Sequence, residues 1–170
     1  MLCTIGLLVT CGRPSQKQLL KRIAAAEEVL MKDSLPVRQH ALDAAQTFMD
    51  YITAFPDDTS SNPRFWFKAA ELYNVAELPE KAIALTDSFM KYYPEHPFFP
   101  YVLHFRGAVY ELSLYDTRNA TIAYEQIISD YNTPEHYELV TSALASLQYM
   151  GMSADEIFED LKSKGLIQDE

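Results

Sequence analysis

Residues that could carry out chemistry are few in this chain of 170 residues, and they lie far apart in sequence. The histidines are the first candidates for a metal site or a general base: His40, His96, His104 and His136. A zinc site on one helix needs two histidines four residues apart, and no two histidines here have that spacing. The sequence also lacks a glycine-rich phosphate loop and a Gly-x-Ser-x-Gly turn. We therefore expect no metal site, no cofactor and no catalytic residues.

Neighbouring carboxylates do not change this expectation. Glu27 and Glu28 form one adjacent pair, and Asp57 and Asp58 form another. Consecutive side chains on a helix or loop do not converge on one point, so we interpret both pairs as solvated charge. His96 belongs to the sequence PEHP, which is typical of a turn, and we expect its ring to lie in solvent.

Composition limits the classes of partner. The chain has a formal net charge of −10 and a sequence pI near 4.8. Nucleic-acid binding depends on Lys and Arg, so we expect no nucleic-acid partner, and unaided adsorption to an anionic membrane is disfavoured for the same reason. Hydrophobic residues make up 48% of the chain, which is typical of one globular domain with a sizeable core.

The only two cysteines, Cys3 and Cys11, lie near the start of the chain. The remaining chain therefore contains neither a disulfide framework nor a thiolate metal cluster. Residues 2–10 are apolar, small and uncharged, and they resemble the central region of a secretory signal. Residues 8–11, with the sequence LVTC, resemble a bacterial lipobox, in which the cysteine thiol receives a diacylglyceryl lipid after cleavage before it.

The match to a lipobox has two departures. Thr10 stands where Gly, Ala or Ser is usual, and no Lys or Arg precedes the apolar run. The second departure is explained if translation starts further upstream. The resemblance implies a leader over residues 1–11, a polar tether over 12–16, and a lipid on Cys11 that anchors the protein in the bacterial cell envelope, facing the periplasm at the outer membrane. The alternatives are an exported protein without lipid, or a cytoplasmic protein whose first residues pack on the domain.

The remaining chain has the periodicity of helices. From residue 16, apolar residues recur at spacings of three and four, and no segment alternates with a period of two. We therefore expect an all-α fold, with Asn62 as an N-cap and Ser153 and Glu156 as a capping box. The expected helices span about 16–33, 36–55, 63–76, 79–93, 100–114, 117–131, 134–149 and 153–164.

A unit of two helices repeats along the chain. Pro63, Trp66, Ala70 and Tyr73 recur in the next unit as Pro100, Leu103, Gly107 and Tyr110. In the second helix of the unit, Ala82, Phe89 and Tyr93 recur as Ala120, Ile127 and Tyr131. The interval between these residues is one residue longer than the interval in the first helix. One extra residue therefore precedes Ala120. Small residues in mid-helix, such as Gly107, indicate a close approach between helices, since glycine there costs about 1 kcal/mol of helix propensity.

These residues resemble the tetratricopeptide repeat family. The repeat at 63–94 has the family's pattern at Trp66, Ala70, Tyr73, Ala82 and Pro94. It departs from the pattern in the second helix, where Thr86 and Phe89 replace the usual aromatic residue and alanine. The resemblance implies an α-α superhelix of about three helical pairs in one domain over 17–165. The repeats would span 17–56, 63–94 and 100–132, with capping helices over 134–164. The alternative is another solenoid of helical pairs or an irregular bundle.

The resemblance also implies a protein-binding groove lined by the first helix of each pair. Its positions are Arg64, Phe67, Glu71, Asn74, Tyr101, His104, Ala108 and Glu111. This mixed aromatic and polar set suits a peptide or helix from another protein. In the other interpretation, Phe67 and Tyr101 belong partly to the core. We expect a non-enzymatic scaffold in the envelope, resembling small bacterial tetratricopeptide lipoproteins, or alternatively a soluble intracellular adaptor.

The lipobox interpretation predicts a specific mature N-terminus. Mass spectrometry of the protein from its native host will show a chain that begins at a lipid-modified Cys11, because cleavage precedes the cysteine and its thiol carries the lipid. Cys11→Ser will abolish both the lipid and the cleavage. A chain that keeps Met1 and a free thiol at Cys11 would instead establish the cytoplasmic alternative.

Overall fold

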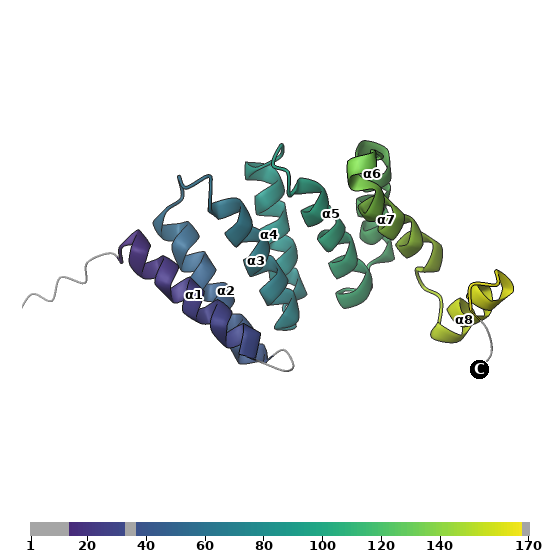
Figure 1. The fold of residues 1–170 in the computed structure, drawn as a ribbon, viewed down its shortest axis with the longest axis horizontal. Coiled ribbons are helices and arrows are strands. Elements are labelled where there is room, and N and C mark those ends of the chain that lie inside the picture. The colour runs from purple at the N-terminus through teal and green to yellow at the C-terminus, as the bar shows by residue number, and fades with distance from the viewer. Residues whose placement is uncertain (1–13, 33–36, 168–170) are drawn as a thin grey trace, which may run out of the picture.

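The computed structural model describes residues 14–32 and 37–167, and this part of the chain is helical throughout, without strands (Figure 1). The all-α prediction is therefore confirmed. Eight α-helices follow one another: α1 (Gln16–Lys32), α2 (Arg38–Ala54), α3 (Asn62–Val75), α4 (Pro79–Tyr92), α5 (Phe99–Ala108), α6 (Thr117–Asp130), α7 (Tyr137–Tyr149) and α8 (Ala154–Ser163). A π-helical stretch, η1 (Val109–Ser113), continues α5, and a 3-10 turn, η2 (Pro134–His136), precedes α7.

The helices pack in neighbouring pairs along an elongated array. Each helix from α1 to α7 contacts the next one in the chain, and α5 also contacts α7. Figure 1 shows α1 and α2 at one end of the array and α8 at the other. No helix in the described part of the chain is both long enough and apolar enough to cross a membrane.

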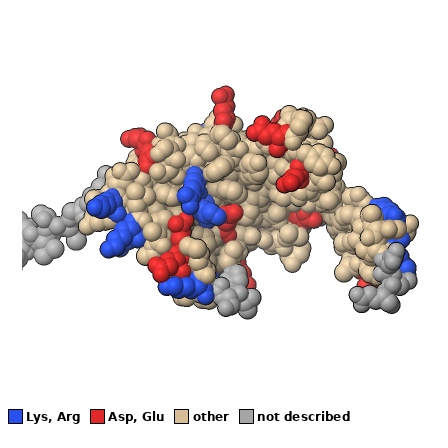
Figure 2. Space-filling view, in the orientation of Figure 1, with Lys and Arg blue, Asp and Glu red and all other residues tan. Residues whose placement is uncertain are grey.

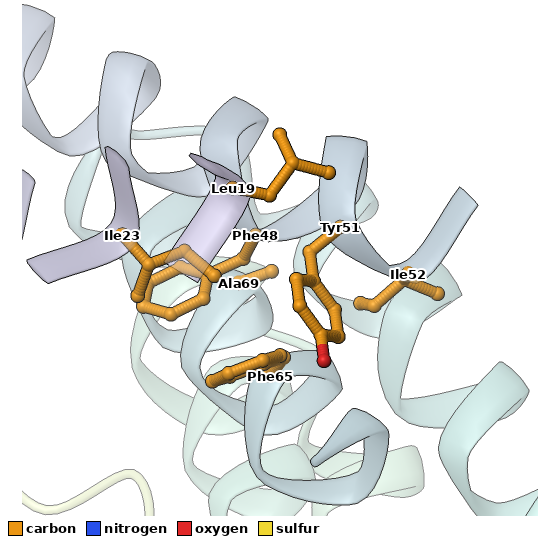
Figure 3. Packing of buried hydrophobic residues seen from close by; sticks show 7 residues of the cluster. All are labelled: Leu19, Ile23, Phe48, Tyr51, Ile52, Phe65 and Ala69. Carbon is orange, nitrogen blue, oxygen red and sulfur yellow. The ribbon is translucent and has the colours of Figure 1, made fainter. Parts of the chain in front are cut away.

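The first three helices share one hydrophobic cluster (Figure 3). Its buried members are Leu19 and Ile23 of α1, Phe48, Tyr51 and Ile52 of α2, and Phe65 and Ala69 of α3. The ring of Phe65 lies 5.3 Å from that of Phe48 and meets Tyr51 edge to face at 4.8 Å. Because two aromatic residues of α2 enclose one of α3, this packing fixes how the first helical pair meets the second.

Residues about one repeat apart in the sequence lie side by side in the structure. Four hydrogen bonds or ion pairs join residues about one repeat apart: Arg64 to Glu27, Arg38 to the carbonyl of Ala76, His104 to Ser142, and Ser113 to Asn74. The two non-glycine residues with positive φ in the described part, Glu77 at 59° and Tyr115 at 54°, occupy equivalent positions of successive units. Each ends the turn between the two helices of a pair, so the same connection occurs twice.

The π-helical stretch accommodates the extra residue of the second repeat. The backbone N–H of Leu114 donates to the carbonyl of Val109, five residues earlier, instead of the four of an α-helix. A single π turn thus takes up one more residue than the α-helix it interrupts. The sequence ELSLYDTRNA is one residue longer than its counterpart, and the structure places the difference at the end of α5.

One local prediction about helix caps is confirmed and one is wrong. The capping box of Ser153 and Glu156 is confirmed at the start of α8. Ser61, not Asn62, is the N-cap of α3, and Asn62 is the first helical residue. The buried Asn62 amide donates instead to the carbonyl oxygens of Phe55 and Pro56, so it closes the preceding loop. Pro36, where the second helix was expected to begin, lies outside the described residues, and α2 begins at Arg38.

Asp58 corrects the interpretation of the Asp57–Asp58 pair as solvated charge. Its carboxylate accepts hydrogen bonds from the hydroxyl of Tyr51, the side-chain amide of Gln16, and the hydroxyl of Ser60. The bond from Tyr51 is the main cause that holds the Asp58 pKa well below its usual value. Asp58 therefore ties the α2–α3 loop to α1 and α2. Glu27 is also not simply solvated, since it pairs with Arg64 at 3.3 Å.

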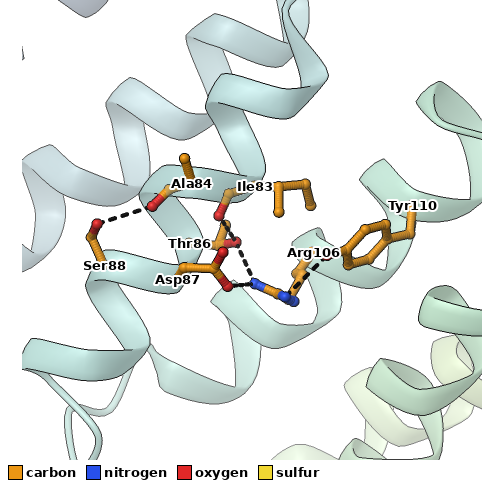
Figure 4. Close-up of polar contacts among 7 residues, drawn as sticks. All are labelled: Ile83, Ala84, Thr86, Asp87, Ser88, Arg106 and Tyr110. Atoms are coloured by element: carbon orange, nitrogen blue, oxygen red, sulfur yellow. Dashed lines mark hydrogen bonds and ion pairs between the residues drawn. The ribbon is translucent and has the colours of Figure 1, made fainter.

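A fork of hydrogen bonds joins α4 to α5 (Figure 4). The Arg106 guanidinium pairs with Asp87, donates to the Thr86 hydroxyl at 3.2 Å and donates to the Tyr110 hydroxyl at 3.0 Å. The Thr86 hydroxyl also donates to the carbonyl of Ile83 at 2.8 Å. Thr86 is 1% exposed, and these bonds satisfy its buried hydroxyl.

Gly107 provides a test of the packing between α5 and α6. A Cβ atom at this position would lie 2.7 Å from Cε1 of Tyr124, which is closer than carbon atoms approach. We expect Gly107→Leu to lower the free energy of unfolding by about 1 to 3 kcal/mol through overpacking, measured by urea titration. The control is Ala84→Leu at an exposed position of α4. Equal stability of both variants would contradict the close approach.

Tyr51→Phe tests the contribution of Asp58 and its dependence on pH. A carboxyl group whose pKa is lowered on folding stabilises the folded state. This stability is fully present above the group's pKa in the unfolded chain and is lost as the pH falls below that pKa. We expect the variant to lose about 0.5 to 1.5 kcal/mol at neutral pH, the usual range for one hydrogen bond. This loss will shrink below about pH 4. Tyr92→Phe, at an exposed ring, will show no such effect. A loss that is independent of pH would contradict the role of Asp58.

Candidate functional site

The structure brings five of the eight predicted groove residues together around one hollow of about 560 Å³. They are Phe67 and Glu71 of α3 and Tyr101, His104 and Ala108 of α5. Spacings of three and four residues place each set on one face of its helix. The hollow is completed by Phe98, Phe105 and Leu139.

The other three predicted residues do not line this hollow. Arg64 reaches across to Glu27 of α1, and the Asn74 side chain accepts a hydrogen bond from Ser113 at 2.9 Å. Glu111 accepts a hydrogen bond from the Tyr124 hydroxyl at 2.8 Å. These side chains hold neighbouring helices together, so their polar groups are already engaged within the chain.

A second hollow of about 480 Å³ adjoins the first and shares Tyr101, His104 and Leu139 with it. It lies between α5 and α7 and includes Glu135, Glu138 and Ser142 among its lining residues. We call the two hollows together the α5 groove. One side of the groove is formed by α3, the centre by α5 and the other side by η2 and α7.

Sequence reasoning missed the contribution of α7, although a signal for it exists. Leu139 is the equivalent of Tyr101 one unit later, and Ser142 is the equivalent of His104. The repeat therefore extends to the first helix of one more unit, which was expected only to cap the array. Phe105 was missed too, because its equivalent in the preceding unit is Lys68, which was not a predicted groove position. The rings of Phe105 and Phe67 meet edge to face at 5.6 Å and form the floor between α3 and α5.

Phe67 and Tyr101 differ in burial, which bears on whether they belong to the core. Phe67 is half-buried against Phe105. The side chain of Tyr101 is 46% exposed, and Phe98 beside it is 39% exposed. The groove thus presents aromatic surface to solvent, and it is supported from below by aromatic packing.

His104 lies at the centre of the groove and is half-buried. Burial lowers its pKa, with a smaller opposing effect from the charge of Glu111. Its Nε2 atom is 2.9 Å from the hydroxyl oxygen of Ser142, and its ring centre is 5.6 Å from that of Tyr124. Burial also raises the pKa of Tyr124 to about 12. Both side chains are therefore held in their neutral forms at neutral pH.

The contact between His104 and Ser142 lacks the other parts of a hydrolytic site. A serine nucleophile needs hydrogen-bond donors aimed at the developing oxyanion. Ser142 lies inside α7, where the helix itself uses the backbone N–H groups. Within residues 14–32 and 37–167, no three His, Cys, Asp or Glu side chains are placed to hold a metal ion.

Two further predicted features concern residues away from the groove. Cys11, the predicted lipid site, and Cys3 lie outside the described residues. His96 was expected in solvent, but its half-buried ring lies 5.8 Å from that of Phe89 and 5.0 Å from that of Phe98. Its Nδ1 accepts a hydrogen bond from the backbone N–H of Phe98, so it shapes the α4–α5 turn.

No family model matches this chain, and comparisons with curated proteins and with solved structures also give no match.

Proposed function

We propose that this protein is a non-enzymatic scaffold that binds other proteins through the α5 groove. Its architecture in this proposal is a superhelix of the tetratricopeptide type. Support comes from the repeated two-helix unit in the sequence, the two equivalent turns at Glu77 and Tyr115, and the side-chain contacts between residues about one repeat apart. Arrays of this kind use the first helix of each pair for binding.

One observation carries the proposal. Five positions that the family resemblance assigns to the groove line a single hollow, and the aromatic ring of Tyr101 is exposed in it. Exposed aromatic surface beside polar side chains is typical of recognition sites for peptides and helices. The partner would bury this surface, which the described residues of the chain leave in water.

The location belongs to the same proposal and rests on the sequence alone. A lipid on Cys11 would anchor the array in the bacterial cell envelope, facing the periplasm, where it would assist the assembly or coordination of an envelope complex. A mature lipoprotein carries several acyl chains, which hold a protein stably at a membrane. The alternative is a soluble intracellular adaptor, and the mature N-terminus distinguishes the two.

Site-specific photo-crosslinking in the native host tests the binding function. A photoreactive phenylalanine analogue replaces Tyr101 in the groove or, as a matched control, Tyr92, which is 62% exposed on α4. We expect a discrete protein adduct at position 101 that is absent at position 92. Ala108→Arg, which fills the groove, will reduce the adduct at least about fivefold, as expected when a well-packed contact is lost.

The control for the blocking variant is Ala84→Arg, which adds the same side chain at an exposed position of α4. It will leave the adduct at position 101 unchanged. Identical adducts at positions 101 and 92, or an adduct that is insensitive to Ala108→Arg, would show that the groove is not the binding surface.

A further inference from the structure

The residues that line the α5 groove carry negative charge, and on the side formed by η2 and α7 no lysine or arginine compensates it. The residues that line it include three carboxylates, Glu71, Glu135 and Glu138, and no Lys or Arg. Glu71 forms an ion pair with Lys68 at 2.8 Å, at the edge of the groove. Within the described residues, neither Glu135 nor Glu138 forms an ion pair. The uncompensated charge thus lies on the side formed by η2 and α7.

The part of the chain around the groove also carries an excess of acidic residues. Between residues 94 and 161 the chain carries eleven Asp or Glu residues and only two Lys or Arg. One of the two, Arg106, is engaged with Asp87 on α4. Figure 2 shows Lys and Arg over the α1 end and over α8, and none over α5 and α7 in this view. Because His104 is neutral when buried, it adds no positive charge to the centre of the groove.

The floor of the groove is apolar and aromatic. Phe67 and Phe105 meet edge to face beneath it, and Phe98, Tyr101 and Leu139 surround the first hollow. A ligand that matches the groove therefore needs an apolar anchor for the floor and positive charge for the rim. Glu138 has a second explanation, since a carboxylate in the first turn of α7 interacts favourably with the positive end of the helix dipole. This explanation does not account for the absence of basic residues among those that line the groove.

We propose that the α5 groove binds a cationic amphipathic segment of another protein, in which an aromatic or aliphatic anchor is flanked by Lys or Arg. This inference rests on the proposed function and specifies its partner. The chain's own last helix does not fit the description, since α8 carries Asp155, Glu156, Glu159 and Asp160 against Lys162. A second copy's α8 would bring like charge to the groove.

The test uses three fluorescent peptides of equal length and the full chain. The first, GSKKLWLKKSG, has the expected anchor and charge. The second, GSEELWLEESG, reverses the charge, and the third, GSKKSSSKKSG, removes the anchor. Fluorescence anisotropy gives the Kd of each. We expect the first peptide to bind at least about tenfold more tightly than either control, and its affinity to fall with added salt.

Matched charge variants separate the groove from the overall charge of the chain. Glu135→Lys with Glu138→Lys will weaken binding of the first peptide about tenfold or more. Glu80→Lys with Glu125→Lys changes the net charge equally at exposed positions of α4 and α6, and it will change the Kd less than about twofold. Equal effects of the two double variants would overturn the proposal, because binding would then follow net charge alone.

Other outcomes are equally decisive. Equal affinity for the first two peptides would overturn the charge assignment, while crosslinking at Tyr101 would still support the binding function. Analytical ultracentrifugation tests whether the chain associates with itself. If it does, and if Glu135→Lys with Glu138→Lys abolishes the association, the occupant of the groove is a second copy, and the proposal is overturned. The second copy would bind through the exposed basic residues of α1, which are Lys17, Lys21 and Arg22. No adduct at Tyr101 in the host would remove the proposed function itself.

Discussion

The junction between α4 and α5 is the constraint on which the rest of the structure depends. The Arg106 guanidinium of α5 spans it, bonded to Asp87 and Thr86 of α4 and to Tyr110 of η1. An arginine can make these bonds together because its donors form a planar fork. The neighbouring residue, Phe105, meets Phe67 of α3 on the other face of α5. The orientation of α5 therefore fixes both the continuity of the array and the floor of the groove.

Behind the groove, the packing of α6 against α5 supplies a second fixed point. Gly107 lets the Tyr124 ring approach the α5 backbone, and the Tyr124 hydroxyl donates to Glu111. The same ring lies beside His104, which lines the groove. Tyr124 thus contacts both the core, at Gly107, and a residue that lines the groove, His104. A change in the core at this point moves the centre of the groove, so the two properties are not independent.

Much of the fold could be predicted from the sequence because the signals for a helix lie in residues that are close together in sequence. Periodicity, prolines at helix starts and the capping box placed the helices within a few residues. The roles of Asn62, Asp58 and His96 could not be predicted, because their partners come from other turns and helices. For the groove, the repeat pattern selected positions on α3 and α5 that line one hollow. It was not extended to Leu139 and Ser142, since α7 was expected only to cap the array.

The last helix differs from all the others in having no buried residue. It touches α7 through hydrogen bonds from Gln148 and Tyr149 to Asp160, and its Phe158 ring is 46% exposed. Since little apolar surface would be exposed when α8 detaches, its local opening costs far less than global unfolding. The chain therefore does not have a single conformational stability. Amide exchange and proteolysis will act on α8 as on a loosely held segment.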